Sequence, residues 1–255
     1  MSTIAIIGGT GRIGTIVTAL LTGQGHTVVV ASPSTGVDAA TGSGLAHALR
    51  GVHTVVDVSK PNTYEDEAVL AYFTTSATRL AAAERAAGVA HHVLLTTVGA
   101  RRDHGIRYYE AKVAAEDIVR DAGVPYSIVR STQFFEFFGT IADASMRDGV
   151  VRLPRALVQP IAARDTAAAV AEAASGGPLE TELEIAGPES MPVDEFVRRG
   201  LIARHDARLV LRDPAAAYFG GHPGERTLLP GDGARLSRTR FGDWLAAHAE
   251  KEAVR

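Results

Sequence analysis

Along the first 130 residues, short apolar runs alternate with longer segments in which apolar residues recur every three or four positions. Short apolar runs between turn residues are typical of buried strands, and the wider spacing is typical of helices that bury one face. The apolar runs predict strands at residues 4–7, 26–31, 54–58, 92–97 and 125–130. The helical spacing predicts helices at residues 15–21, 45–49, about 65–87 and 108–120. This alternation predicts a doubly wound parallel sheet of the α/β class.

A glycine-rich turn follows the first apolar run, where Gly8, Gly11 and Gly14 give the pattern G-x-x-G-x-x-G. In a strand–turn–helix unit, such glycines allow a tight turn, a close approach of a diphosphate and close packing of the helix. The helix that begins here leaves main-chain N–H groups available to bind phosphate. We therefore predict a Rossmann-type dinucleotide site. Its predicted residues are Gly8, Thr10, Gly11, Arg12, Ile13 and Gly14, with Val58 and Ser59 at the end of the third strand.

The end of the second predicted strand indicates which dinucleotide binds. An acidic residue there would bond the ribose hydroxyls and disfavour a 2′-phosphate. The segment 31–35 reads Ala-Ser-Pro-Ser-Thr, and the nearest acid is Asp38. The hydroxyls of Ser32 and Ser34, with Arg12 in the glycine turn, favour NADP(H) as cofactor, and NAD(H) is the alternative.

The remainder of the chain has a different character. Four of the eight phenylalanines fall within residues 134–138, just past a predicted strand. They either form core or line an apolar pocket, so Gln133, Phe134 and Phe135 are candidate substrate-binding residues. Further elements are predicted at residues 165–174, 182–186, 194 onward and 238–250, with Ser237 as the cap of the last helix. We expect one NAD(P)-binding unit, residues 1–255. Within it, residues 1–133 form the dinucleotide-binding core, and residues 134–255 form mostly a small α+β substrate lobe.

Composition narrows the class of protein. The 255 residues carry a net charge of −3 with acids and bases interspersed, which gives no indication of a nucleic-acid or membrane partner. The absence of cysteine excludes disulfides and thiolate chemistry. Adjacent His91 and His92 point to opposite faces of a strand and have no carboxylate cluster nearby, so they are interpreted as structural and no metal is expected. A cytoplasmic monomer or homo-oligomer that acts on a small molecule is expected.

Tyr108 and Lys112 are the strongest candidates for catalysis. They lie four residues apart in a predicted helix, which places both side chains on one face. A neighbouring ammonium favours the phenolate and so lowers the pKa of a tyrosine toward neutrality, and it also donates to ribose hydroxyls. Only three lysines occur in the chain, so this one is a distinctive choice. Thr96 or Thr97, at the end of the preceding strand, could polarise a substrate oxygen.

Several of these segments together resemble the NmrA-like group of atypical short-chain dehydrogenase/reductases. They are residues 8–14, the Tyr108–Lys112 pair, residues 124–134 and residues 185–189. The resemblance covers essentially the whole chain. It implies a Rossmann fold, NAD(P) held by the glycine turn, and a substrate cleft between the sheet and the C-terminal lobe. It also implies Tyr108 as general acid, Lys112 as its partner and Thr96 or Thr97 as hydroxyl donor, with Tyr109 as the competing tyrosine.

We accordingly expect an NADP(H)-dependent oxidoreductase that reduces a carbonyl, enone or quinone-like hydrophobic molecule. One alternative is a non-catalytic dinucleotide sensor that regulates a partner protein, since the NmrA-like group includes such members and Arg101, Arg102 and Arg107 lie in one loop. A further alternative is an epimerase or dehydratase that retains its cofactor.

Overall fold

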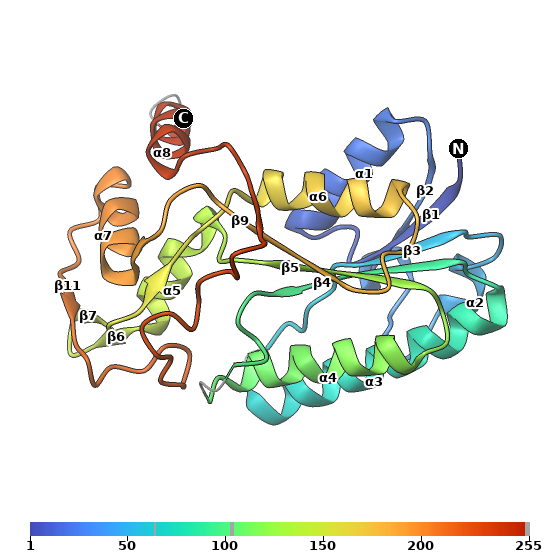
Figure 1. Cartoon of the computed structure of the whole chain (residues 1–255), viewed down its shortest axis with the longest axis horizontal. Helices are drawn as coiled ribbons and strands as arrows, with labels where there is room; N and C mark the ends of the chain where they lie inside the picture. The colour runs from blue at the N-terminus through green and yellow to red at the C-terminus, as the bar shows by residue number, and fades with distance from the viewer. Residues whose placement is uncertain (64, 103–104, 253–255) are drawn as a thin grey trace. The chain divides into compact units, whose positions relative to one another are not determined.

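The computed structural model describes residues 1–63, 65–102 and 105–252. Its main feature is a seven-stranded sheet with the order β12-β9-β5-β4-β3-β1-β2 (Figure 1). The pairings of β1 with β2 and β3, of β3 with β4, and of β9 with β12 are parallel. The strands are β1 (Thr3–Ile7), β2 (Thr27–Ala31), β3 (Thr54–Asp57), β4 (His91–Thr97), β5 (Tyr126–Ser131), β9 (Glu182–Ala186) and β12 (Arg235–Leu236). The predicted Rossmann-type parallel sheet is confirmed.

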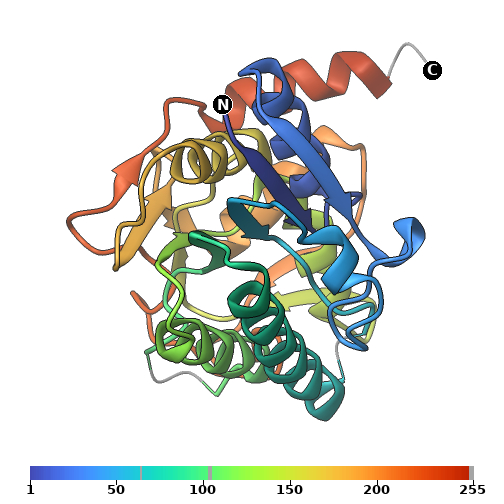
Figure 2. The same ribbon diagram turned by 90° about the vertical axis from the view of Figure 1, so that its right-hand side faces the viewer.

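Helices cover both faces of this sheet. The helices α3 and α4 lie side by side on one face, and α1 and α6 lie on the other (Figures 1 and 2). The helices are α1 (Arg12–Gly23), α2 (Leu45–Ala48), α3 (Asp66–Ala87), α4 (Arg107–Asp121), α5 (Phe138–Ala144), α6 (Ala163–Ser175), α7 (Val193–Ala203) and α8 (Phe241–Glu252). Two short 3₁₀ helices are η1 (Pro33–Thr35) and η2 (Phe135–Phe137). Because both faces are covered, a central strand such as β1 is a continuous apolar run rather than an alternating one.

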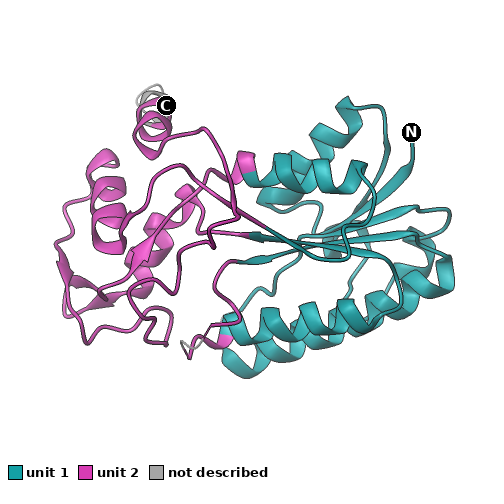
Figure 3. Cartoon of the chain, viewed as in Figure 1, with its two compact units in different colours: residues 1–97, 108–130, 166–183 teal, residues 98–107, 131–165, 184–255 magenta. Residues whose placement is uncertain are grey.

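The chain divides into two compact units, which Figure 3 colours separately. Unit 1 comprises residues 1–97, 108–130 and 166–183. Unit 2 comprises residues 98–107, 131–165 and 184–255. The glycine turn, Thr96, Thr97, Tyr108 and Lys112 belong to unit 1, whereas Gln133, Phe134 and Phe135 belong to unit 2.

Unit 2 is built around aromatic side chains. Phe135, Phe138 and Phe196 pack against Phe241, with ring centroids 4.7 to 6.4 Å from the Phe241 ring. Two small sheets complete the unit. They consist of β6 (Met146–Arg147), β7 (Val150–Leu153) and β11 (Val210–Arg212), and of β8 (Leu157–Val158) and β10 (Met191–Pro192). This arrangement gives the C-terminal part the α+β character that the sequence predicts.

Two details differ from the sequence predictions. The last helix begins at Phe241 rather than at Arg238. Ser237 does not cap it, because the helix begins four residues later and the buried Ser237 hydroxyl has no hydrogen-bond partner in the described part of the chain. The Ser237 N–H instead donates to the Ala186 carbonyl oxygen at 2.8 Å and extends the line of β12. The short strands of unit 2 were not predicted, because two to four residues are too few for a period to emerge. In the predicted charged loop 100–107, Asp103 and His104 lie outside the described residues.

Gly200 supplies a test of the aromatic packing. A Cβ atom on Gly200 would lie 2.3 Å from Cγ of Phe138, so Gly200→Ala should lower the free energy of unfolding by about 1–3 kcal/mol. The matched control is Gly23→Ala, because Gly23 is also helical and a Cβ there would meet nothing within 4 Å. The control should be neutral or stabilising by up to about 1 kcal/mol. Urea denaturation measures both, and equal stabilities would contradict the packing described.

Candidate functional site

The glycine turn of unit 1 is compact because main-chain atoms approach one another closely. Gly8 has a φ of 80°, and a Cβ on it would lie 2.8 Å from the Ser59 Cα. A Cβ on Gly14 would lie 2.3 Å from the Gly8 carbonyl oxygen. Side chains at these two positions would therefore push β3, the turn and α1 apart. The positive φ also makes residue 8 one that glycine adopts without strain.

The start of α1 has the properties of an anion site. Gly11 is the N-cap residue, it makes no side-chain capping bond, and the first turn contains no acidic residue. The first N–H groups of a helix have no partner within the helix, and its N-terminus carries partial positive charge. Ser59, which lies against Gly8, has a buried hydroxyl oxygen without a hydrogen-bond partner in the described part of the chain. These observations fit the pyrophosphate of a dinucleotide.

The residues predicted to select the cofactor have different surroundings. The Ser32 side chain is buried, accepts a bond from the Thr10 N–H at 3.1 Å and donates to the Ala31 carbonyl at 2.8 Å. Ser32 therefore joins the glycine turn to the end of β2. Ser34 and Arg12 are exposed, and the Ser34 hydroxyl donates to Thr10 Oγ1 at 3.5 Å. Of the three, Ser34 and Arg12 have the accessibility that contact with a 2′-phosphate requires.

Tyr108 and Lys112 meet on a common aromatic ring. The Tyr108 ring packs edge-on against Phe73 of α3, with centroids 5.5 Å apart and an interplanar angle of 86°. The Lys112 Nζ atom lies 4.3 Å from the centroid of the same Phe73 ring. Tyr108 is half-buried, whereas Tyr109 is buried. The structure thus brings the two predicted catalytic side chains to one face of α4.

The Lys112 ammonium is held in an environment with little water. It is 7% exposed, and Nζ donates to the Leu95 carbonyl oxygen at 3.1 Å. Burial lowers the pKa of Lys112 to about 8, and the carboxylates of Asp57 and Glu116 oppose this shift. Asp57 ends β3 and accepts the Ser59 N–H at 2.9 Å. At neutral pH, Lys112 is thus a desolvated cation with two carboxylates to balance it.

The two candidate threonines differ in their partners. The Thr96 hydroxyl donates to Glu116 Oε1 at 2.7 Å, and both side chains are buried. A hydroxyl has one proton, so Thr96 in this arrangement has none to donate to a substrate. Successive strand residues point to opposite faces, and Thr97 is half-buried. Thr97 is the threonine whose hydroxyl proton is not committed to Glu116.

The sequence analysis missed Asp57, Glu116 and Phe73. Glu116 continues the four-residue spacing of Tyr108 and Lys112, so that spacing could have revealed it. Phe73 and Asp57 come from other elements, and only the fold brings them to Lys112.

The predicted substrate-binding residues lie in unit 2. Phe135 is 1% exposed and packs on Phe241 and Trp244, so its ring is part of the aromatic core. Phe134 is half-buried, with its ring 5.7 Å from that of Phe137, and Gln133 is also half-buried. A role in substrate binding stays a prediction for all three.

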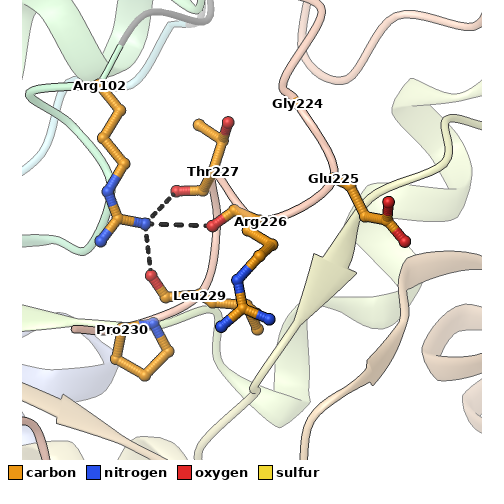
Figure 4. Close-up of a pocket in the computed structure, with 7 residues that line it drawn as sticks. All are labelled: Arg102, Gly224, Glu225, Arg226, Thr227, Leu229 and Pro230. Atoms are coloured by element: carbon orange, nitrogen blue, oxygen red, sulfur yellow. Dashed lines mark hydrogen bonds between the residues drawn. The ribbon is translucent and has the colours of Figure 1, made fainter. Parts of the chain in front are cut away.

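Unit 2 also contains an open cavity of about 380 Å³ (Figure 4). Arg102 Nη1 donates to the carbonyl oxygens of Arg226, Thr227 and Leu229, at 2.6 to 3.2 Å. The residues that line the cavity are Arg102, Gly224, Glu225, Arg226, Thr227, Leu229 and Pro230. These bonds fasten the segment 224–230 to the turn that contains Arg102, so one arginine of the predicted basic loop has a structural partner.

The two histidines have separate partners within unit 1. His92 Nδ1 lies 2.7 Å from Glu84 Oε1, and His91 Nε2 lies 2.9 Å from Ser127 Oγ. The described residues contain no group of three or more side chains able to hold a metal ion. No described helix combines the length and hydropathy that crossing a membrane requires.

Comparisons with known proteins add to this geometry. No protein-family model matches the chain. The (4-alkanoyl-5-oxo-2,5-dihydrofuran-3-yl)methyl phosphate reductase of Streptomyces griseus is 28% identical, over 97% of this chain and 98% of that protein. The structure of MoeE5 in complex with UDP-glucose and NAD is similar over 100% of both chains, with a TM-score of 0.77 and 17% identity. The dTDP-4-dehydrorhamnose reductase of Bacillus anthracis in complex with NADP has a TM-score of 0.68 and 15% identity, over 84% of this chain and 86% of that chain.

The similarity to a reductase over nearly the whole chain supports the prediction of an oxidoreductase, and the structural likeness confirms the Rossmann-type fold. Of the two solved structures, one contains NAD and the other NADP. Membership of the NmrA-like group, the preference for NADP(H) and the individual site residues stay predictions.

Lys112 makes the stability of unit 1 depend on pH. Burial disfavours the Lys112 ammonium more than Asp57 and Glu116 favour it. Lys112→Met, which replaces this cation with an apolar side chain of similar length, should therefore be about 1–3 kcal/mol more stable than the wild type at pH 7. Between about pH 8 and the unfolded value of about 10.4, the unfolded wild type binds more protons than the folded one. Its free energy of unfolding therefore gains a rising contribution, and the advantage of the variant should shrink by pH 9.5.

Urea denaturation at pH 7 and pH 9.5 measures this difference. The control is Lys60→Met, which removes an exposed ammonium. A Lys112→Met variant that is less stable than wild type at pH 7 would contradict the desolvated state of this lysine.

Proposed function

We propose that this protein is an NADP(H)-dependent reductase of a small hydrophobic molecule that contains a carbonyl, enone or quinone-like group. The proposal rests mainly on one observation: Tyr108 and Lys112 both contact the Phe73 ring, in the same unit as a glycine turn suited to a pyrophosphate. When bound, the cofactor supplies or accepts a hydride. The proposal rests on what the residues of this chain do around that transfer.

Each residue has one task in the proposed reaction. The main-chain N–H groups after Gly11 bind the pyrophosphate, and Arg12 and Ser34 bind the 2′-phosphate. Tyr108 donates a proton to the substrate oxygen as hydride reaches the substrate carbon, so the product gains one hydride and one proton. The Lys112 ammonium stabilises the phenolate that remains and donates to the ribose hydroxyls.

The relative at 28% identity supports the enone class in particular. The dihydrofuranone in its name has a ring carbon–carbon double bond conjugated with two carbonyl groups. Reduction of such a bond places hydride on the carbon remote from the carbonyls and charge on a carbonyl oxygen. A proton donor such as Tyr108 suits that oxygen.

A second candidate function is transient oxidation by a retained cofactor, as in an epimerase or dehydratase. It is favoured by the fold, since a UDP-glucose 4-epimerase and an NDP-hexosamine 5,6-dehydratase share it. Net consumption of NADPH distinguishes reduction from this alternative and from a non-catalytic sensor.

Tyr108→Phe tests the proposed general acid. It should lower kcat by about 10²–10⁴-fold while leaving the Kd of NADPH within about threefold, because only the proton donor is removed. The measurement is NADPH oxidation with a panel containing an aldehyde, a conjugated enone and a quinone. Tyr109→Phe is the matched control and should retain turnover. Loss of turnover in Tyr109→Phe, with retention in Tyr108→Phe, would move the acid role to Tyr109.

The proposed cofactor preference has its own test. NADPH should bind at least about tenfold more tightly than NADH, since one charged contact to a phosphate contributes roughly 1.5–3 kcal/mol. Arg12→Ala should weaken NADPH while changing the Kd of NADH little. Arg50→Ala, which removes an exposed arginine outside the proposed site, is the control. Isothermal titration calorimetry measures the six Kd values, and tighter binding of NADH by the wild type would reverse the assignment.

A further inference from the structure

Helix α4, which carries Tyr108 and Lys112, also carries a fully buried carboxylate, Glu116, which is 0% exposed. Its oxygens accept bonds from Thr96 Oγ1 at 2.7 Å, from Arg130 Nε at 3.0 Å and from Arg130 Nη2 at 2.6 Å. Arg120 Nη1 adds a longer bond at 3.3 Å. Glu116 thereby connects α4 to the ends of β4 and β5.

These contacts extend outward to Glu182. Arg130 Nη1 lies 3.3 Å from Glu182 Oε1, and Arg120 Nη2 lies 3.1 Å from Glu182 Oε2. With Asp117, whose Oδ1 lies 3.6 Å from Arg120 Nη1, the cluster contains three carboxylates and two guanidiniums. Its two glutamates differ. Glu116 is fully buried, whereas the Glu182 side chain is 39% exposed. Such a difference allows the inner carboxylate to be compared with an outer one that shares both of its arginines.

Glu116 is also one helical turn beyond Lys112, on the same face of α4. Lys112 faces Phe73 of α3, the Leu95 carbonyl of β4 and the carboxylates of Asp57 and Glu116. Both carboxylates favour the ammonium form of Lys112, whereas burial disfavours it. Replacing the Glu116 charge should therefore make the Lys112 ammonium harder to maintain.

We infer that Glu116 is a positioning residue, which keeps Lys112 protonated inside unit 1 and fixes the Tyr108–Lys112 face of α4 against β4 through its bond with Thr96. Its effect on catalysis rests on the proposed function. Its effect on the charge of Lys112 does not, because that charge belongs to the protein without cofactor or substrate.

The charge of Lys112 can be measured directly. The chain has only Lys60, Lys112 and Lys251, so labelling lysine with ¹³C at Cε gives a spectrum with few signals, and Lys112→Met assigns the one of interest. A pH titration of the full-length protein then gives the midpoint for Lys112. Glu116→Gln should lower this midpoint by at least about half a pH unit. Glu116→Asp retains the carboxylate and should largely restore it.

Glu182→Gln is the matched control, because Glu182 binds the same two arginines without being buried. It should leave the Lys112 midpoint within about 0.2 pH units, since an exposed charge is screened by water. An unchanged midpoint in folded Glu116→Gln would overturn the inference. An equal shift in Glu182→Gln would also do so, because the effect would then belong to the whole cluster.

Glu116→Gln leaves part of the buried Arg130 charge without its partner, and this can prevent folding. The variant Glu116→Gln/Arg130→Gln removes both charges, and because the Arg130 cation that opposes the Lys112 ammonium is also gone, its midpoint should lie between those of Glu116→Gln and the wild type. If neither variant folds, Glu116 is a determinant of stability and the positioning role is rejected.

Turnover provides the catalytic readout. In Glu116→Gln, the alkaline fall of kcat should move to lower pH by the same amount as the NMR midpoint, whereas Glu182→Gln should keep the wild-type profile. A shifted midpoint with an unshifted kcat profile rejects the catalytic part of the inference. If no variant and no wild-type protein oxidises NADPH, the proposed function fails while the titration still decides the role of Glu116 toward Lys112.

Discussion

The cost of removing charged side chains from water constrains unit 1 more than any other interaction. Lys112, Glu116 and Arg130 are all buried, and none of them would be tolerated there as an isolated charge. The bidentate contact of Arg130 with Glu116 and the nearby Asp57 compensate this cost. Because each partner comes from a different element, the compensation exists only when α4, β3, β4 and β5 are assembled. The charged cluster is thus a condition of the fold as well as a feature of the site.

A steric constraint operates at the other end of the site. Gly8 and Gly14 permit main-chain contacts that any side chain would block, and the resulting turn leaves the start of α1 without a side-chain cap or an acid. The same close packing that joins β3 to the turn also buries the hydroxyl of Ser59. The packing of this turn against β3 and the proposed binding of a phosphate group at the start of α1 therefore depend on the same glycines, Gly8 and Gly14.

Features with a regular period could be predicted from the sequence, and features defined by partners could not. The apolar runs at residues 4–7 and 54–58 predicted β1 and β3 closely, because strands buried on both faces are apolar throughout. Ser237 was predicted as a cap because its residue type is suited to capping, yet its N–H bonds to Ala186 instead. Ser32 and Thr96 show the same limit of sequence-based prediction within the candidate site. Their hydroxyls are predictable as hydrogen-bonding groups, but the partner is set by the fold.

Phe73 explains how one face of α4 can bring a buried lysine and a tyrosine together through contact with a neutral side chain. The ring attracts the Lys112 ammonium through its π face without offering a proton acceptor, and it makes a T-shaped contact with the Tyr108 ring. Lys112 therefore shares the Phe73 ring with Tyr108, and among the described residues no carboxylate forms an ion pair with it. An ion pair at this point would fix the ammonium more tightly and leave less of its field to act on Tyr108. The arrangement instead balances the lysine charge at a distance, through Asp57 and Glu116, and keeps its nearest contacts neutral.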